Sequence, residues 1–221
     1  MSEFLEIEGK TAVAIMLSGG VESTACIQHA LDKDYYPMCF FVSMWPNTYP
    51  HMPHVKATCS LYGVEMWDLR LTGREFDRDA EISHYTSHWW AVYGSMIAVA
   101  YPKLKYFWIG ENSGVRFAND APDAVTPLEH YGKSLALIES ASTMVGGRAK
   151  ALFPLWKLSK VEQYDMIRED VRPHLVTCEK QFDFEQPRCR QCDKCKEFDS
   201  MWDEDLYEWQ CEEVTKKYVE L

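Results

Sequence analysis

Four cysteines near the carboxyl end of the chain restrict what it can fold into more than any other feature. Cys178, Cys189, Cys192 and Cys195 follow the pattern C-x10-C-x2-C-x2-C. Two Cys-x2-Cys steps let neighbouring thiolates bind one ion, and a fourth sulfur from a longer loop completes a tetrahedral site of four sulfurs, which suits zinc. Because four thiolates leave no open position for water, we expect a structural Zn²⁺ site that fixes this segment.

Length, cysteine count and net charge favour a globular protein whose cysteines are reduced. The chain has 221 residues, eight cysteines and a net charge of -11. The clustered four have the spacing of metal ligands, which favours thiols over a disulfide framework, although thiols or disulfides without metal remain the alternative. The acidic balance argues against non-specific binding to nucleic acid. With no apolar run that could span a bilayer and no secretory signal, we expect a cytoplasmic protein.

The order of the expected elements indicates an α/β fold. Apolar runs with the length of buried strands alternate with helical segments. The expected strands are 11–17, 37–44, 64–69 and 106–109, and the expected helices are 23–31, a helix ending at Gly63 and 88–101. This alternation predicts a parallel sheet with helices on both faces. Ligands of such sheets bind beyond the carboxyl ends of the strands, so the turns at 18–23 and 110–114 are expected to share a site.

The second part of the chain is expected to be mostly helical. We predict a helix over 129–145, a turn over 153–156, a helix opened by a capping box formed by Ser159 and Glu162, and a helical tail. We therefore divide the chain into an α/β domain over 1–155 and a C-terminal helical segment with the four-cysteine zinc site over 156–221.

The turn after the first expected strand, MLSGGVES, has the composition of an anion site. Glycines let backbone amides converge, and the helix that follows adds partial positive charge at its N-terminus. The lysine of a Walker loop and the G-x-G-x-x-G dinucleotide pattern are both missing from this turn. A simple tight turn is the alternative, but the strand context and the flanking serines favour phosphate binding.

This turn resembles the SGG-x-D-S pyrophosphate loop (PP-loop) of the adenine-nucleotide alpha-hydrolase superfamily, whose members cleave ATP between its alpha and beta phosphates. The resemblance implies a Rossmann-like sheet and a pyrophosphate site. The residues that it assigns to this site are Ser18, Gly19, Gly20, Val21, Glu22 and Ser23. Glu22 stands where the superfamily has aspartate, and we expect it to coordinate Mg²⁺ or to order the loop.

The cysteine pattern narrows the resemblance to the 7-cyano-7-deazaguanine synthases, which carry a similar cysteine module behind a pyrophosphate-loop domain. The segment PLWKLSKVE places Lys160 at the family's lysine position. Asp123, in Ala-Pro-Asp, resembles the family's proline-aspartate loop, and Glu111 occupies an acidic position after the fourth expected strand. One departure is Arg190, which replaces a glycine often found after the second cysteine.

The resemblance implies an ATP-dependent ligase that converts 7-carboxy-7-deazaguanine and ammonia to the nitrile through an adenylated intermediate. Lys160 and Glu22 would be catalytic, and Glu111 and Asp123 would bind the substrate. ATP, Mg²⁺ and Zn²⁺ would be required, and the partners would be the small-molecule substrate and ammonia, with no membrane or nucleic acid. A homodimer is expected from the family alone.

Two other functions stay open at this point. A related enzyme could stop at the amide or modify another nucleobase or nucleoside; thiolation would need a reactive cysteine, for which Cys26 or Cys39 would have to serve. The chain could also be a non-catalytic nucleotide-binding module. Two histidine pairs, His51 with His54 and His84 with His88, are weaker metal candidates because neither has a third ligand at suitable spacing.

Overall fold

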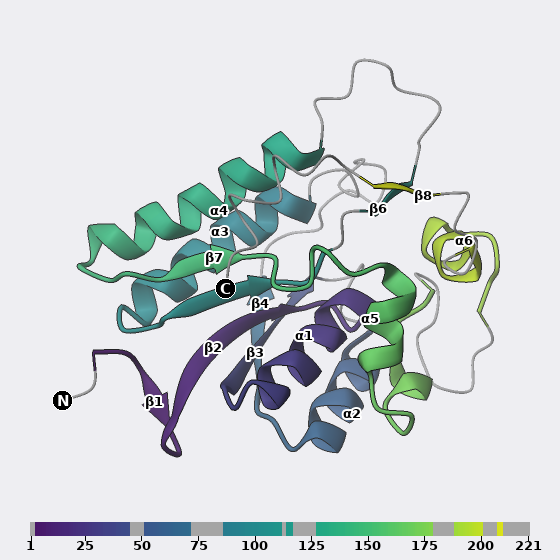
Figure 1. Ribbon diagram of the computed structural model, residues 1–221, viewed down its shortest axis with the longest axis horizontal. Helices are drawn as coiled ribbons and strands as arrows, with labels where there is room; N and C mark the ends of the chain where they lie inside the picture. Colours follow the sequence, from purple (N-terminus) through teal and green to yellow (C-terminus); the bar gives the residue numbers. More distant parts are fainter. Residues whose placement is uncertain are drawn as a thin grey trace.

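The computed structural model describes residues 3–44, 51–71, 86–111, 114–116, 127–178, 188–200 and 207–209. Its centre is a parallel sheet with the strand order β4-β3-β2-β5-β7 (Figure 1). The strands are β2 (Lys10–Leu17), β3 (Tyr36–Met44), β4 (Met66–Leu71), β5 (Tyr106–Ile109) and β7 (Lys150–Leu152). A short strand, β1 (Glu6–Ile7), pairs antiparallel with the start of β2.

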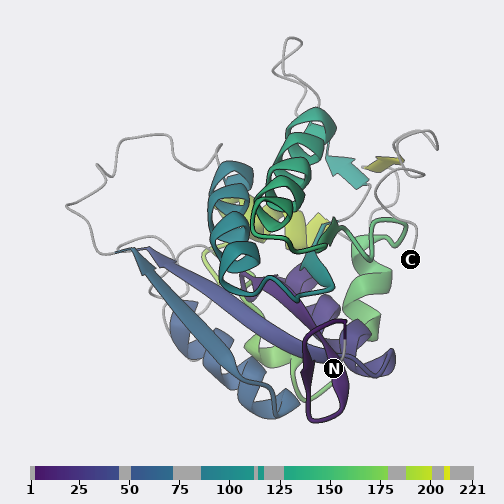
Figure 2. The ribbon, with the colours of Figure 1, turned by 90° about the vertical axis from the view of Figure 1, so that its left-hand side faces the viewer.

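Helices cover both faces of the sheet, as Figures 1 and 2 show. Helices α1 (Val21–Asp32), α2 (Met52–Tyr62) and α5 (Lys160–Met166) lie on one face, and α3 (Thr86–Ala100) and α4 (Pro127–Met144) lie on the other. The alternation along β2 explains both layers, because successive side chains of a strand point to opposite faces. Val13, Ile15 and Leu17 belong to the apolar cluster with α1, whereas Ala12, Ala14 and Met16 belong to the cluster with α3 and α4.

The order in which the parallel strands are added to the sheet reverses between β2 and β5. From β2 the chain continues outward to β3 and β4, and it then returns to the other side of β2 to form β5 and β7. In the register of the two central strands, Met16 lies opposite Ile109, so their carboxyl ends lie side by side. Parallel sheets bind ligands in the crevice at such a reversal. The predicted α/β class and the predicted adjacency of the two turns are confirmed.

Local signals placed the helix ends correctly. Helix α2 ends at Gly63, whose φ of 68° is the left-handed conformation that glycine adopts without steric cost. Helix α5 begins with the predicted capping box, in which the Glu162 N–H donates to Ser159 Oγ and the Ser159 N–H donates to the Glu162 carboxylate. This box fixes the first turn of α5, which carries Lys160.

The expectation of a helical tail is wrong at residues 207–209. They form β8 (Tyr207–Trp209), which pairs antiparallel with β6 (Gly114–Arg116). Two aromatic residues in a Tyr-Glu-Trp triplet favour an extended chain over a helix. The strands β1, β6 and β7 were not predicted, because runs of two or three residues are too short for a periodic signal.

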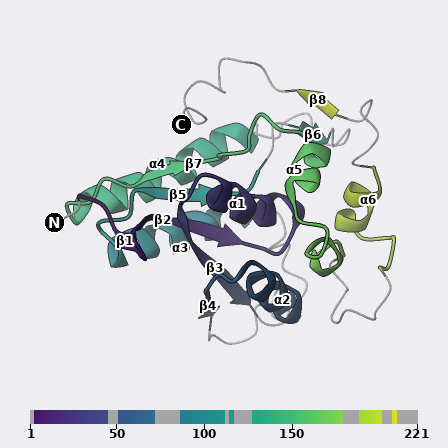
Figure 3. The same ribbon diagram turned by 60° about the horizontal axis from the view of Figure 1, so that its bottom comes forward.

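The segment that follows β7 packs against the same core as α1. Ile167, Val171 and Leu175 belong to the apolar cluster on that face of the sheet. The 3-10 turn η3 (Arg172–His174) and helix α6 (Asp193–Ser200) then lead through the cysteine segment, and Figure 3 shows α5 and α6 beyond the end of β2. The boundary at residue 155 stays a prediction. None of the helices in the described part of the chain combines the length and the apolar character that a membrane span requires.

Candidate active site and metal centre

The turn from β2 to α1 is held by its own serines. The Ser18 N–H donates to Ser23 Oγ over 3.1 Å, the two serine hydroxyls are 3.0 Å apart, and the Gly20 N–H donates to Ser18 Oγ over 3.3 Å. Gly20 caps α1 without a side-chain acceptor, so the first N–H groups of the helix face the loop. The arrangement gathers backbone and hydroxyl donors at a helix N-terminus, where an anion is favoured.

Two glycines allow other segments to approach this loop closely. A Cβ atom on Gly19, whose φ is 80°, would lie 2.7 Å from Val176 Cγ2. A Cβ atom on Gly110, the residue after β5, would overlap the backbone nitrogen of Ser23. The exit of β5 therefore crosses the first turn of α1 in direct contact. The sequence predicted that the two turns share a site, because both follow strands of a parallel sheet. Only the structure shows that glycine is needed at both contacts.

Lys160 and Glu22 form an ion pair beside the loop. Lys160 Nζ lies 2.7 Å from Glu22 Oε1, and the exposed fractions of the two side chains are 8% and 18%. Lys160 lies in the first turn of α5 and Glu22 in the first turn of α1, so the pair joins the two helices at their N-termini. The structure thus brings the two predicted catalytic residues together. The Glu22 carboxylate binds the Lys160 ammonium group, so both side chains lie at the start of α1, where the loop ends.

Glu111 follows β5 and is tied to the same helix through its backbone. Gln163, one turn after Lys160 on α5, is fully buried, and its side-chain amide donates to the carbonyl of Glu111 over 3.3 Å. The same amide group donates to the carbonyls of Leu155 and Leu158, both at 3.1 Å. Residues three apart share a helix face, so α5 holds the exits of β2, β5 and β7 from one side. Gln163 was missed from sequence because nothing local distinguishes it from a surface glutamine.

The carboxylates of Glu22 and Glu111 act on a common neighbour. Burial raises the pKa of the Cys26 thiol, and the negative charges of Glu22 and Glu111 raise it further. Cys26 is fully buried on α1, so its thiol is protonated at neutral pH. The Glu22 side chain and the Glu111 backbone both contact α5, through Lys160 and Gln163.

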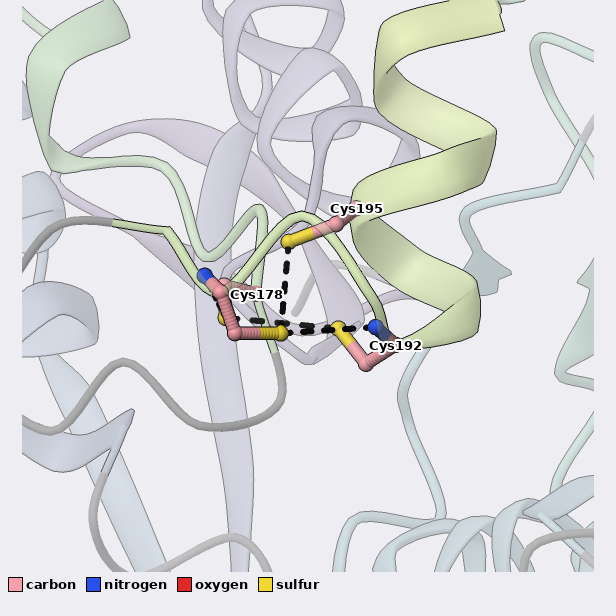
Figure 4. A group of neighbouring side chains, drawn as sticks. Cys178, Cys192 and Cys195 are labelled. Carbon is pink, nitrogen blue, oxygen red and sulfur yellow. Dashed lines mark hydrogen bonds between the residues drawn. The ribbon is translucent and has the colours of Figure 1, made fainter.

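The four cysteines of the C-terminal cluster converge as predicted. Their sulfur atoms all lie within 4.8 Å of one another, with 3.9 Å between Cys189 and Cys195 and 4.0 Å between Cys192 and Cys178 (Figure 4). Zinc–sulfur bonds of about 2.3 Å in a tetrahedron place the sulfur atoms about 3.8 Å apart, so the group fits one Zn²⁺ ion. A [4Fe–4S] cluster would hold its four thiolates farther apart, because each thiolate binds a different iron.

Backbone N–H donors and burial shift the pKa values of two of the four thiols in opposite directions. The N–H groups of Gln191 and Cys192 donate to Cys189 Sγ and lower the pKa of Cys189 to about 6. Burial raises the pKa of Cys195 to about 12. A bound cation would favour the thiolate form of both, since metal ligands must be deprotonated. Arg190, in the turn between Cys189 and Cys192, has a φ of 57°, which lies in the left-handed region that favours glycine.

The metal centre and the loop are directly connected. The Val176 N–H donates to the Gly19 carbonyl over 2.8 Å, and Val176 stands two residues before Cys178. Both Val176 and Cys178 are buried, with exposed fractions of 3% and 0%. The first cysteine of the cluster therefore lies on the segment that closes one side of the loop. Val176 was not predicted, because a lone valine between turns carries no sequence signal.

Other predicted residues have different outcomes. Asp123 and His84 lie outside the described residues, and the side chain of His88 is not described. His51 and His54 are buried, and His54 Nδ1 lies 3.3 Å from the His174 carbonyl. Among the described residues, the cysteine cluster is the group of histidine, cysteine and acidic side chains that could hold a metal.

Comparisons with known proteins identify similar structures only. No protein-family model and no curated protein matches the sequence. Similar solved structures include the U34-tRNA thiolase NcsA from Methanococcus maripaludis with its [4Fe-4S] cluster, at 16% identity and a TM-score of 0.46, covering 70% of this chain and 54% of that one. A predicted subunit of tRNA methyltransferase from Methanocaldococcus jannaschii is similar at 15% identity and a TM-score of 0.45, covering 71% of this chain and 73% of that one.

A 4-thiouridine synthetase in complex with RNA and bound ATP gives 16% identity and a TM-score of 0.43, covering 90% of this chain and 51% of that one. The chain thus spans about half the length of this synthetase and of NcsA. Similarities of this size say nothing about activity.

Proposed function

We propose that the protein is an ATP-dependent carbon–nitrogen ligase that converts 7-carboxy-7-deazaguanine and ammonia to 7-cyano-7-deazaguanine, releasing AMP and diphosphate. The observation that carries the proposal is the Ser18–Ser23 loop at the reversal point of the sheet, with the buried Lys160 ammonium group beside it. The specific substrate rests on the sequence resemblance, because the geometry by itself supports binding of a nucleotide's phosphates.

The loop would bind the beta and gamma phosphates of ATP. The Gly20 N–H now donates to Ser18 Oγ, and a phosphate oxygen could take that acceptor's place. Lys160 would neutralise part of the charge that develops when diphosphate leaves, and Glu22 would keep its ammonium group at the loop. Preorganised donors of this kind stabilise a charged transition state without reorganising during the reaction. Mg²⁺, when bound with ATP, would supply further neutralisation of the phosphates.

The chemistry needs two activations of oxygen. The substrate carboxylate attacks the alpha phosphorus of ATP, and diphosphate leaves. Ammonia adds to the resulting acyl adenylate, AMP leaves with the carboxyl oxygen, and an amide forms. The amide oxygen then attacks the alpha phosphorus of a second ATP, and a second diphosphate leaves. Loss of the nitrogen protons and of AMP gives the nitrile, so both oxygens of the acid leave on AMP.

The remaining predicted residues have supporting roles in this proposal. Glu111 and Asp123 would accept hydrogen bonds from the amino and ring N–H groups of the deazaguanine. The four cysteines would hold a structural Zn²⁺ ion, since they leave no position open for water. Small-molecule substrate and ammonia would be the partners, and the protein would function as a homodimer.

The proposal is tested by incubating the purified protein with 7-carboxy-7-deazaguanine, ATP, Mg²⁺ and ¹⁵N-ammonium, and by following the products with mass spectrometry. We expect a ¹⁵N-labelled nitrile together with AMP and diphosphate. K160M should reduce the rate about 100-fold or more, because it removes a charge-stabilising donor. K157M is the matched control, since Lys157 is exposed and lies three residues earlier. Absence of ATP turnover with this substrate would refute the proposal.

The same assay separates the alternatives. A labelled amide without nitrile would identify an enzyme that stops after the first activation, and nucleotide binding without turnover would identify a non-catalytic module. Thiolation through Cys26 or Cys39 is disfavoured, because both thiols are fully buried and burial contributes to a raised pKa in each. A buried thiol with a raised pKa is a poor nucleophile.

A further inference from the structure

We propose that Val176 is a positioning residue for the phosphate loop: its N–H fixes the orientation of the Gly19–Gly20 peptide, and the metal bound by the four cysteines holds Val176 in place. Metal and pyrophosphate binding are then coupled. This inference rests on the proposed function, because it assumes that the loop binds phosphates.

The first step is the geometry of one peptide. The Gly19 carbonyl accepts a hydrogen bond from the Val176 N–H over 2.8 Å. In a trans peptide the carbonyl of one residue and the N–H of the next point in opposite directions. The Gly20 N–H therefore points away from Val176, and it donates to Ser18 Oγ inside the loop. That N–H is one of the donors available to an anion.

The second step is the freedom of this peptide without Val176. Glycine populates positive and negative φ with similar ease, so a peptide between two glycines can flip with little steric cost. A flipped peptide would present the Gly19 carbonyl to the phosphates and would turn the Gly20 N–H away from them. The hydrogen bond from Val176 selects the orientation that attracts an anion.

The third step is the tether between Val176 and the metal. Cys178 is fully buried two residues after Val176, and its sulfur atom lies 4.0 Å from that of Cys192. On the other side, Leu175 and Val171 anchor the segment in the core next to α1. Without metal, Cys178 is held only by contacts of its thiol. The segment from Leu175 to Cys178 then becomes more mobile, and with it Val176, which contacts the loop.

The fourth step is reciprocity. If bound metal favours the competent orientation of the loop, metal must raise pyrophosphate affinity, and pyrophosphate must raise metal affinity by the same factor. A hydrogen bond to a charged acceptor corresponds to a change of about 10-fold or more in affinity. We therefore expect a coupling of about 10-fold in both directions.

The experiment measures pyrophosphate and Zn²⁺ affinities of the full chain by calorimetry and chelator competition. V176P removes the N–H, and Leu175 already has the extended conformation, φ -66° and ψ 140°, that a residue before proline requires. V176A keeps the N–H but loses packing, and I97A removes a buried side chain from the apolar cluster on the other face of the sheet. V176P should weaken pyrophosphate binding about 10-fold relative to V176A.

The outcomes distinguish this inference from the proposed function. If the wild-type protein does not bind pyrophosphate or ATP, the proposed function fails. If the wild type binds but V176P equals V176A, or if removing Zn²⁺ leaves pyrophosphate affinity unchanged in a protein whose circular dichroism spectrum is preserved, the inference fails alone. Metal affinity that rises about 10-fold with saturating pyrophosphate in the wild type, and less in V176P, supports it. Loss of binding in I97A as well would trace the effect to general destabilisation and overturn the inference.

Discussion

Shortening Glu22 by one methylene tests whether the ion pair with Lys160 depends on the length of the glutamate side chain. In E22D the carboxylate retracts by about 1.5 Å, a carbon–carbon bond length. The nitrogen–oxygen distance of 2.7 Å then becomes about 4.2 Å if the backbone stays in place. With an effective dielectric constant of about 20, the attraction falls from about 6 to about 4 kcal/mol.

We therefore expect E22D to lower the free energy of unfolding by about 2 kcal/mol. For a chain of this size the melting temperature should fall by about 4–8 °C. Urea unfolding followed by tryptophan fluorescence measures the first quantity, and scanning calorimetry measures the second. The exposed fractions of 8% and 18% are low enough that solvent screens the pair little.

A double-mutant cycle isolates the pair from other effects of the shorter side chain. In a K160M background the ammonium group is absent, so E22D should cost less than about 0.5 kcal/mol. A cost of about 2 kcal/mol in both backgrounds would refute the reasoning, because the effect could not then arise from Lys160. Wild-type stability of E22D would refute it as well, and would mean that the loop adapts to the shorter side chain.

Three further predictions concern backbone and metal. G19A should destabilise the protein by about 3 kcal/mol, because alanine at positive φ is strained and its Cβ would meet Val176. G63A is the control: its Cβ would have nothing within 4 Å, so it should cost only about 1 kcal/mol. Equal losses of stability for the two variants in urea unfolding would contradict this prediction. R190G should stabilise the metal-bound protein by about 1 kcal/mol, because it relieves a φ of 57°; an unchanged melting temperature would count against it. Zinc affinity should fall as the pH drops through about 6, where Cys189 becomes protonated. Its pKa is lowered in the folded chain, so the thiolate that binds metal is present above that value and is lost below it. Calorimetry in buffers of different ionisation enthalpy should detect about one more proton released per zinc at pH 5 than at pH 7.

Sequence reasoning was most accurate where a residue's role depends on its neighbours in the chain. The apolar run before Ser18 predicted the central strand, the glycines predicted the turn, and Ser159 with Glu162 predicted the start of α5. The cysteine spacing predicted four converging sulfur atoms, because two-residue steps restrict where neighbouring thiols can lie. In each case a short segment carries enough information to fix its own geometry.

It was least accurate where a contact joins segments far apart in the chain. Gln163 binds the carbonyl of Glu111, 52 residues away, and nothing around either residue signals this bond. The extended tail at 207–209 depends on a partner strand at 114–116, which a local pattern cannot provide. The role of Glu22 also required the structure, because sequence placed it near phosphate but could not show that Lys160 occupies its carboxylate.

The segment after β7 gives these long-range contacts a common origin. Lys160 binds Glu22 in the β2 exit, Gln163 binds Glu111 in the β5 exit, and Val176 binds the carbonyl of Gly19. All three contacts come from 17 consecutive residues, 160–176, and Cys178 follows two residues later. A segment that contacts both exits at the reversal point of the sheet must order them together, since neither exit can move without breaking a buried contact. A metal ion held by the four cysteines at its end would then stabilise more than its own loop, as the proposed coupling between the cysteine site and the Ser18–Ser23 loop requires.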